Sequence, residues 1–233
     1  MQKSMFDAEA LIAMFENATA KQGEQLRKAT SQATLAALQG RELSLKNIRG
    51  VLKQVSGAAS AGAAKNLTMG IDPEALLDKA VAGMDDAMLK AVDANRMALG
   101  TLMSQGADMR DKHMTKALSD LEKMEDTMFA ALKKTAEGAG APMAGAWGQV
   151  LGKMQAGGTL SGAQAATTAE QMAEQMQTAI RSTRAASMRA AQALAESYTA
   201  MVSGVLIGMT EAIQSGGAAR TAAGPAAKAA PKR

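Results

Sequence analysis

The sequence has no cysteine, a single histidine and only 2% aromatic residues among its 233 positions. Without cysteine the chain cannot form disulfides or thiolate metal sites, which fits a reducing cytoplasm. A single histidine is too few for the ligand sets of zinc sites and of di-iron sites in helical bundles. The scarcity of strand-favouring residues argues against a sheet. These absences predict an all-α protein without a metal or other cofactor.

Long apolar runs are missing as well. The best membrane candidate extends from Tyr198 to Met209 between Glu196 and Glu211, whereas a span needs about twenty apolar residues. Near the N-terminus, Asp7 and Glu9 stand where a signal peptide would need an apolar core. We therefore expect a cytoplasmic protein without a transmembrane segment, soluble or at most bound to a surface.

Alanine and nineteen methionines dominate the hydrophobic residues, which make up 47% of the chain. Small side chains allow helices to approach closely, but each of them buries little area. Methionine fills irregular gaps and is over-used on adaptable binding surfaces. The composition predicts closely packed helices of modest stability per residue.

One stretch, from Asp72 to Lys134, organises the chain. Gly70, Asp72 and Pro73 form a helix boundary, because glycine suits the end of one helix while aspartate and proline suit the start of the next. From Leu77 to Leu132 an apolar stripe advances in fifteen steps over 55 residues, and only Asn95, Gly106 and His113 interrupt it. The mean step of about 3.7 indicates an eleven-residue repeat on one face of a nearly straight helix. The residues of this stripe that we predict to form a hydrophobic contact face are Met84, Met88, Leu99, Leu102, Met109, Leu121, Met124 and Met128.

The length of this stretch leaves two arrangements open. A continuous helix over residues 72–137 would span about 96 Å, whereas a compact chain of this size is roughly 45 Å across. A hinge at Ser104-Gln105-Gly106 would fold the stretch into two shorter halves. The continuous form is the favoured expectation and implies an elongated antiparallel bundle of long amphipathic helices.

The remaining segments flank this central one. Residues 1–68 are expected to form a helical hairpin, with a first helix over 4–39 that Ser4 caps and a second from Arg41. The small-residue run from Ser56 to Ala64 either packs two helices together or frays. Residues 142–214 are expected to form a short helix with Trp147 and a long last helix that Ser161 caps. Residues 215–233, rich in Ala, Pro and Lys, are expected to be disordered.

Charge is distributed unevenly along the chain. The basic tail consists of Arg220, Lys228, Lys232 and Arg233, which together equal the formal net charge of +4. The tail is either a solubilising end or a weak, salt-dependent contact for nucleic acid or another anionic surface. The first segment is basic and the central one acidic, so either they pack against each other or both face solvent.

No residue pattern indicates an active site. His113 lies on the apolar stripe, where a structural role is the expected one. The neighbouring carboxylates Asp85-Asp86 and Glu125-Asp126 point about 100° apart on a helix and do not converge within each pair. The glycine-rich segment 138–148 has no phosphate-binding motif and no preceding strand. We therefore expect that the protein is not an enzyme.

Two stretches, Asn17-Ala18-Thr19-Ala20-Lys21-Gln22 and Ala36-Ala37-Leu38-Gln39-Gly40-Arg41-Glu42-Leu43, carry a family resemblance, together with the ending Pro225-Ala226-Ala227-Lys228-Ala229-Ala230-Pro231-Lys232-Arg233. With its cysteine-free, Ala-rich amphipathic helices, the chain resembles the phasins, bacterial proteins that coat polyhydroxyalkanoate granules. The segment Gly83 to Thr135 also resembles an uncharacterised bacterial all-helical domain, which implies no function.

The resemblance to the phasins implies a coat or tether on a hydrophobic cytoplasmic inclusion, with the Met/Leu face as the contact. Two alternatives stay open. One is an oligomeric scaffold or partner-binding bundle, whose apolar stripes are covered by partner helices or further copies of the chain. The other is a nucleoid-associated protein that uses the basic tail.

Overall fold

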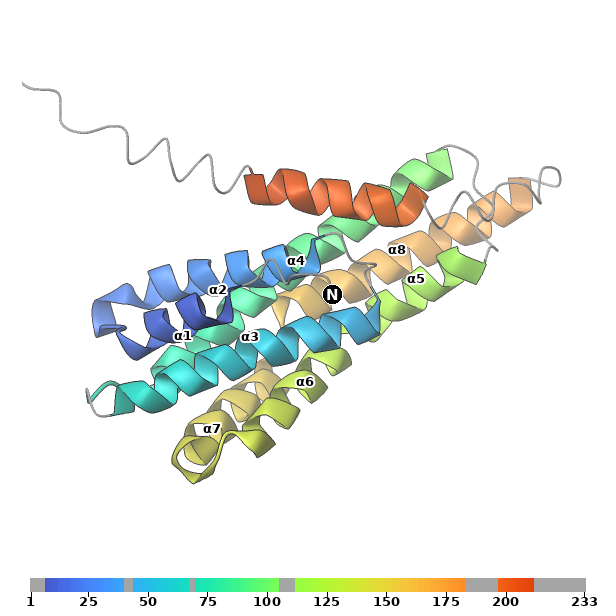
Figure 1. Cartoon of the computed structure of the whole chain (residues 1–233). Coiled ribbons are helices and arrows are strands. Elements are labelled where there is room, and N and C mark those ends of the chain that lie inside the picture. Colours follow the sequence, from blue (N-terminus) through green and yellow to red (C-terminus); the bar gives the residue numbers. More distant parts are fainter. Residues whose placement is uncertain (1–6, 40–43, 68–69, 105–111, 183–196, 212–233) are drawn as a thin grey trace, which may run out of the picture.

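The helices fold back on one another to form an elongated antiparallel bundle (Figure 1). The computed structural model describes residues 7–39, 44–67, 70–104, 112–182 and 197–211. The elements are α1 (Ala8–Glu16), the 3-10 helix η1 (Ala20–Gln22), α2 (Gly23–Leu38), α3 (Leu45–Asn66), α4 (Pro73–Ser104), α5 (Lys112–Glu122), α6 (Met124–Gly138), α7 (Ala141–Gly157) and α8 (Leu160–Ser182). Residues 197–211, hereafter the C-terminal helix, are also helical. The described chain contains no strand, which confirms the all-α prediction.

The predicted boundary before Pro73 is confirmed. Gly70 has a φ of 73°, a value that favours glycine over residues with a side chain. The backbone N–H of Glu74 donates to Asp72 Oδ1 at 3.0 Å, so Asp72 caps a helix that begins at Pro73. The resulting α4 has 32 residues, a length of about 48 Å.

A single helix over residues 4–39 is wrong. The first helix is α1, and its N-terminal cap is Asp7, which accepts a hydrogen bond from the N–H of Ala10 at 3.0 Å. The expected cap, Ser4, lies outside the described residues. The chain then breaks after Glu16, where Thr19 and Gln22 form a reciprocal capping box around η1. Local side-chain hydrogen bonds thus offer the backbone an alternative to a continuous helix, and α1 and α2 fold beside each other.

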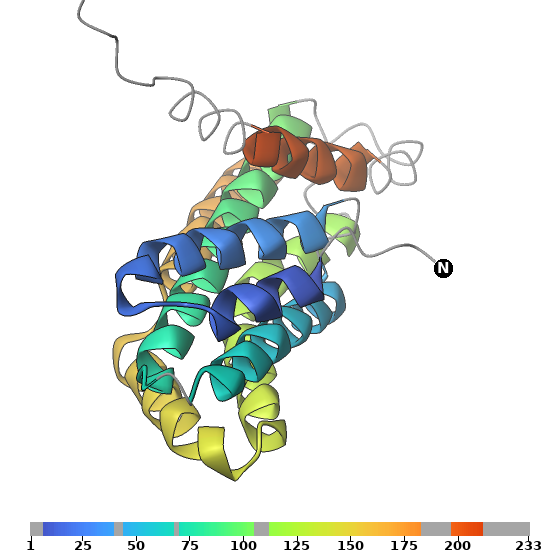
Figure 2. The ribbon, with the colours of Figure 1, turned by 60° about the vertical axis from the view of Figure 1, so that its left-hand side comes forward.

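The continuous central helix is also wrong. The stretch forms α4, α5 and α6, and α3 packs against both α4 and α6. Figures 1 and 2 show that α4 and the α5–α6 pair run in opposite directions. Both halves of the apolar stripe can then be buried against the same neighbour, which a straight helix of about 96 Å would not allow. The proposed hinge at Gly106 lies outside the described residues.

The C-terminal part of the chain also contains more helices than expected. The short helix with Trp147 is α7, and α8 follows it. The C-terminal helix does not continue α8 but lies beside the distal end of α4 (Figures 1 and 2). One hydrophobic core links residues of all these helices. The expected disordered tail, residues 215–233, lies outside the described residues.

Candidate functional site

The predicted contact face forms the centre of the hydrophobic core. Met109 lies outside the described residues, and the other seven members are no more than 2% exposed. They lie on α4, α5 and α6, whose inner sides are covered by α2, α3, α7 and α8. The structure therefore brings the predicted residues together, but it turns them toward the chain's own helices.

Two ion pairs hold α2 against α4, where α2 covers part of the contact face. The Arg27 guanidinium donates to both oxygens of Asp86, at 2.6 and 2.7 Å. This hydrogen bond raises the pKa of Arg27. Next to it, Lys79 donates to Glu24 at 2.8 Å and lowers the pKa of the Glu24 carboxyl. The first pair follows the predicted attraction of the basic segment for the acidic one, and the second has the opposite polarity.

Two glycines bring backbones into direct contact. A Cβ on Gly83 of α4 would collide with the backbone oxygen of Arg27 on α2. A Cβ on Gly62 of α3 would lie 2.5 Å from the Ile12 oxygen and 2.6 Å from the Phe15 Cβ of α1. For the run from Ser56 to Ala64, close packing is thus the arrangement found.

Polar contacts also join α3 to α6 and α7 inside the core. The hydroxyl oxygens of Ser56 and Thr135 are 2.7 Å apart and share a hydrogen bond between α3 and α6. The indole Nε1 of Trp147 on α7 donates to Ser60 Oγ at 3.1 Å. Trp147 is fully buried and belongs to the same core as the contact face. Its fluorescence can therefore report on the state of this core.

Carboxylates from two helices meet at the start of α8. The backbone N–H groups of Leu160 and Ser161 donate to Asp85 at 2.9 and 3.0 Å. The backbone N–H of Thr159 donates to Glu125 at 2.7 Å. The expected cap Ser161 is therefore within the first turn, and the Thr159 hydroxyl accepts from the N–H of Gly162 at 3.0 Å in its place.

These partners could not be recognised from the sequence. Asp85 is 76 residues from Ser161, and Asp86 is 59 residues from Arg27. The neighbours Asp85 and Asp86 do diverge, as expected, and each serves a different helix pair. No periodic or local signal links positions so far apart in the chain.

The C-terminal helix packs on α4 around a polar contact. The Tyr198 hydroxyl donates to Oδ1 of Asn95, one of the three interruptions of the apolar stripe. Val202 and Leu206 are buried next to this contact. Asn95 itself is 1% exposed, so the polar interruption marks the place where the C-terminal helix sits.

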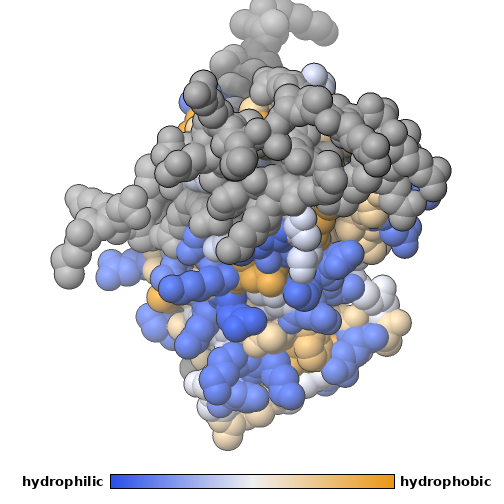
Figure 3. Space-filling view, turned by 90° about the vertical axis from the view of Figure 1, so that its right-hand side faces the viewer, coloured by the Kyte–Doolittle hydropathy of each residue, from blue (hydrophilic) through white to orange (hydrophobic). Residues whose placement is uncertain are grey.

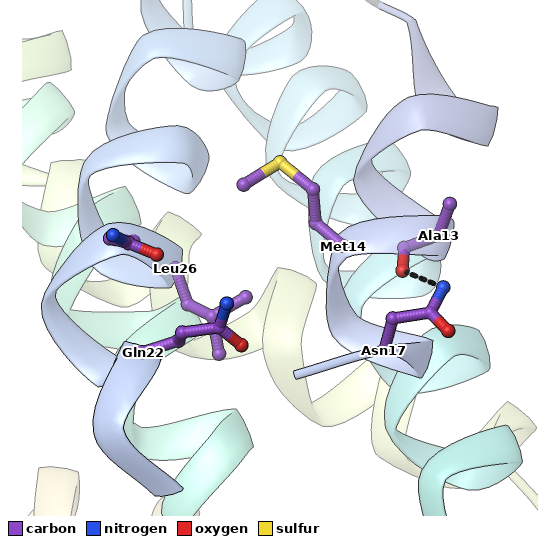
Figure 4. Close-up of a pocket in the computed structure, with 6 residues that line it drawn as sticks. Ala13, Met14, Asn17, Gln22 and Leu26 are labelled. Carbon is purple, nitrogen blue, oxygen red and sulfur yellow. Dashed lines mark hydrogen bonds between the residues drawn. The ribbon is translucent and has the colours of Figure 1, made fainter. Parts of the chain in front are cut away.

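A surface pocket lies between α1 and α2. Its volume is about 300 Å³, and it is lined by Ala13, Met14, Asn17, Gln22, Gln25 and Leu26. Figure 4 shows Asn17 turned back onto its own helix, where its amide donates to the Ala13 oxygen at 2.9 Å. Gln22 accepts from the backbone N–H of Thr19 at 2.8 Å. The amides of Asn17 and Gln22 therefore serve helix ends, which leaves Gln25 as the remaining amide of the lining.

The described surface is polar with scattered apolar residues. On the coloured part of the face in Figure 3, hydrophilic side chains predominate, with small apolar areas between them. The large exposed hydrophobic side chains are Met14, Leu67, Met97, Leu160 and Ile207, which come from different parts of the chain. None of the described helices combines the length and the hydropathy needed to cross a membrane.

Within the described residues, no three acidic or histidine side chains are grouped so that they could hold a metal ion. The backbone of His113 belongs to α5, but its side chain lies outside what the structure describes. All four residues of the basic tail also lie outside the described residues, namely Arg220, Lys228, Lys232 and Arg233. The nucleic-acid contact predicted for the tail therefore stays a prediction.

Comparison with known proteins gives a family assignment. Residues 1–215 match the model of a family of unknown function, DUF6781. No curated protein and no solved structure matches the chain. The family model covers nearly the whole sequence, including all the described helices. The chain therefore belongs to the DUF6781 family.

Proposed function

We propose that this protein is a non-enzymatic coat or tether that keeps its contact face closed when alone and opens to spread it over a hydrophobic inclusion. The burial of the whole described contact face by helices of the same chain is the observation that carries the proposal. An amphipathic stripe that can pair with its own chain can pair with another apolar surface when these helices separate. The inclusion is of the polyhydroxyalkanoate type that the resemblance to phasins implies, in a reducing cytoplasm.

The composition of the core favours such an opening. Alanine and methionine bury less area per residue than a core of large aromatic residues, so separating the helices exposes less apolar surface. The ion pairs and hydroxyl contacts between the helices can be replaced by contacts with water at small net cost. Methionine side chains then adapt to an irregular apolar surface.

The opening that uncovers the face is the separation of α1–α3 from α4 and α6. Because the chain has no cysteine, this movement can be blocked by one engineered disulfide. Ser56→Cys with Thr135→Cys places two thiols where two hydroxyl oxygens are 2.7 Å apart. The oxidised protein holds α3 on α6, and a reductant releases it.

The measurement is binding of the purified protein to a neutral polyester or hydrocarbon emulsion, before and after reduction. We expect the oxidised double variant to bind at least about tenfold more weakly than its reduced form, because its largest apolar face stays covered. The single variants, under the same oxidant, are the matched controls and should bind like the unmodified chain. Equal binding by the oxidised and reduced double variant would refute the opening mechanism.

The same burial also supports a second candidate, a permanently closed scaffold. In this case the bundle never opens, and partner helices or further copies of the chain bind its polar exterior. Light scattering would then show a defined assembly, and neither form of the double variant would bind the emulsion. A fluorescent fusion in granule-forming cells would give a diffuse signal, whereas the coat proposal requires the signal on the granules.

A further inference from the structure

The outward side of the C-terminal helix carries one ionised residue, Glu211, at its very end, whereas a surface helix usually has charges along its length. Ala200, Gly204 and Gly208 are exposed, and Ile207 is 41% exposed. No ionised residue occurs between Glu196 and Glu211. A helix that permanently covers a protein in water normally turns charged side chains to the solvent. This helix is therefore poorly suited to remain a permanent outer layer.

Its inner side is a continuous apolar stripe. Val202 and Leu206 are buried, and their apolar neighbours along the helix are half-buried. Its members, each with another member three or four residues away, are Tyr198, Met201, Val202, Val205, Leu206 and Met209. After release from α4, the helix could insert this stripe into an apolar boundary layer.

The site that the helix would leave contains a polar group. Asn95 lies under the helix, and its Oδ1 accepts the hydrogen bond of the Tyr198 hydroxyl. When the helix lifts, water can replace this hydrogen bond at small net cost. The contact therefore favours reversible release more than a purely hydrophobic one would.

We propose that the C-terminal helix is the docking element that attaches the still-closed bundle to an anionic lipid surface. Residues 212–233, which follow the helix directly, contain four basic residues and no acidic one. Basic residues next to an interfacial helix are attracted by anionic headgroups. An apolar helix and a basic segment together supply the two signals that stable surface attachment requires. This inference rests on the proposed function and gives its first step, docking before opening.

The test uses the full chain in its oxidised Ser56→Cys/Thr135→Cys form, so that opening of the bundle cannot contribute. Co-sedimentation with vesicles of phosphatidylglycerol and phosphatidylcholine measures docking. Tyr198→Phe should raise the affinity about three- to tenfold, because the helix loses a hydrogen bond to Asn95 and keeps its apolar face. Leu206→Gln should lower the affinity at least about tenfold, because a polar group then interrupts the inserted face.

The two substitutions distinguish docking from mere covering. Tyr198→Phe and Leu206→Gln both weaken the packing of the C-terminal helix on α4. If the helix only covered α4 and did not insert into the lipid, both substitutions would therefore change the affinity for the vesicles in the same direction. Such a result would overturn the inference. Met14→Gln, at an exposed position on α1, is the matched control and should leave the affinity unchanged.

The charge of the surface is tested separately. With Arg220, Lys228, Lys232 and Arg233 all changed to glutamine, affinity for the anionic vesicles should fall to that for phosphatidylcholine alone. Equal affinity of the parent protein for both vesicles, or binding to short DNA without binding to vesicles, would overturn the anionic-lipid assignment. A failure of the vesicle experiment would not change the emulsion binding of the oxidised and reduced Ser56→Cys/Thr135→Cys protein. The docking inference and the opening proposal can therefore fail independently.

Discussion

Asp85 of α4 and Glu125 of α6 meet at the N-terminus of α8, where they accept hydrogen bonds from its first backbone N–H groups. A helix N-terminus carries partial positive charge and unpaired N–H groups, so two carboxylates there are favourable. The consequence is structural. α8 is fixed to both halves of the central stretch at one point, which aligns α4 and α6 around the core.

We predict that Asp85→Ala and Glu125→Ala each lower the free energy of unfolding by about 1 kcal/mol, the usual effect of losing a helix cap. Urea denaturation followed by circular dichroism measures the change. Asp126→Ala is the matched control, because Asp126 is adjacent to Glu125 but exposed. Its effect should stay within about 0.5 kcal/mol. Equal losses in all three variants would contradict the capping role.

Gly83 and Gly62 should tolerate no larger residue. Alanine at either position meets the backbone of the facing helix, and forcing helices apart costs about 1–3 kcal/mol. Gly57→Ala is the control, since nothing lies within 4 Å of a Cβ at this position of α3. There alanine should raise stability by up to about 1 kcal/mol, because it favours the helix. Thermal unfolding of the three variants gives the comparison, and a stabilising Gly83→Ala would contradict the close contact.

Local sequence patterns predicted the helical class, the start of α4 at Pro73 and the membership of the apolar stripe. These features depend on residues a few positions apart, and helix periodicity expresses them directly. The break between α1 and α2 was missed, although the Thr19–Gln22 capping box that accompanies it is local. The break of the central stretch was only the less favoured alternative. It depends on the packing of the folded chain, because α3 gives both α4 and α6 a common partner.

In the candidate site, too, the local features could be predicted from the sequence and the packing partners could not. The stripe identified residues such as Met88 and Leu121 as a contact face, but periodicity does not tell whether a face meets its own chain or another body. The partners of Asp85 and Asp86 are equally non-local. The polar interruption at Asn95 was visible in the sequence, and only the packed structure shows that Tyr198 makes use of it.

The ion pair of Glu24 with Lys79 predicts a dependence on acid. Its hydrogen bond lowers the pKa of Glu24 below the ordinary value of 4.5 in the folded chain. A carboxyl with a lowered folded-state pKa stabilises the fold above its unfolded pKa and loses this effect as the pH falls through the folded value. We therefore expect this contribution to be constant near neutral pH and to be lost progressively as the pH falls below the ordinary value of 4.5.

Glu24→Gln removes the titrating group and keeps the shape of the side chain. Its urea midpoint should lie closer to that of the parent at pH 3 than at pH 6. An unchanged difference between the two proteins at both values would argue against the pair. The pKa of Arg27 is raised, and so is that of Lys153, which donates to Asp78 and Glu74. These two contributions to stability are therefore present at neutral pH and are lost only at strongly alkaline pH.

The hydrogen bond between Trp147 and Ser60 allows a test of how the core is held together. Ser60→Ala leaves the buried indole N–H of Trp147 without its partner, which should cost about 1–3 kcal/mol. In a Trp147→Phe background the same substitution strands no donor, so its cost should fall below about 1 kcal/mol. Chemical denaturation of the four proteins gives this double-mutant cycle.

Because Trp147 is the only tryptophan, its emission also shows whether Ser60→Ala loosens the core before global unfolding. Additive costs, with no coupling between the two positions, would mean that this hydrogen bond does not hold α7 on α3.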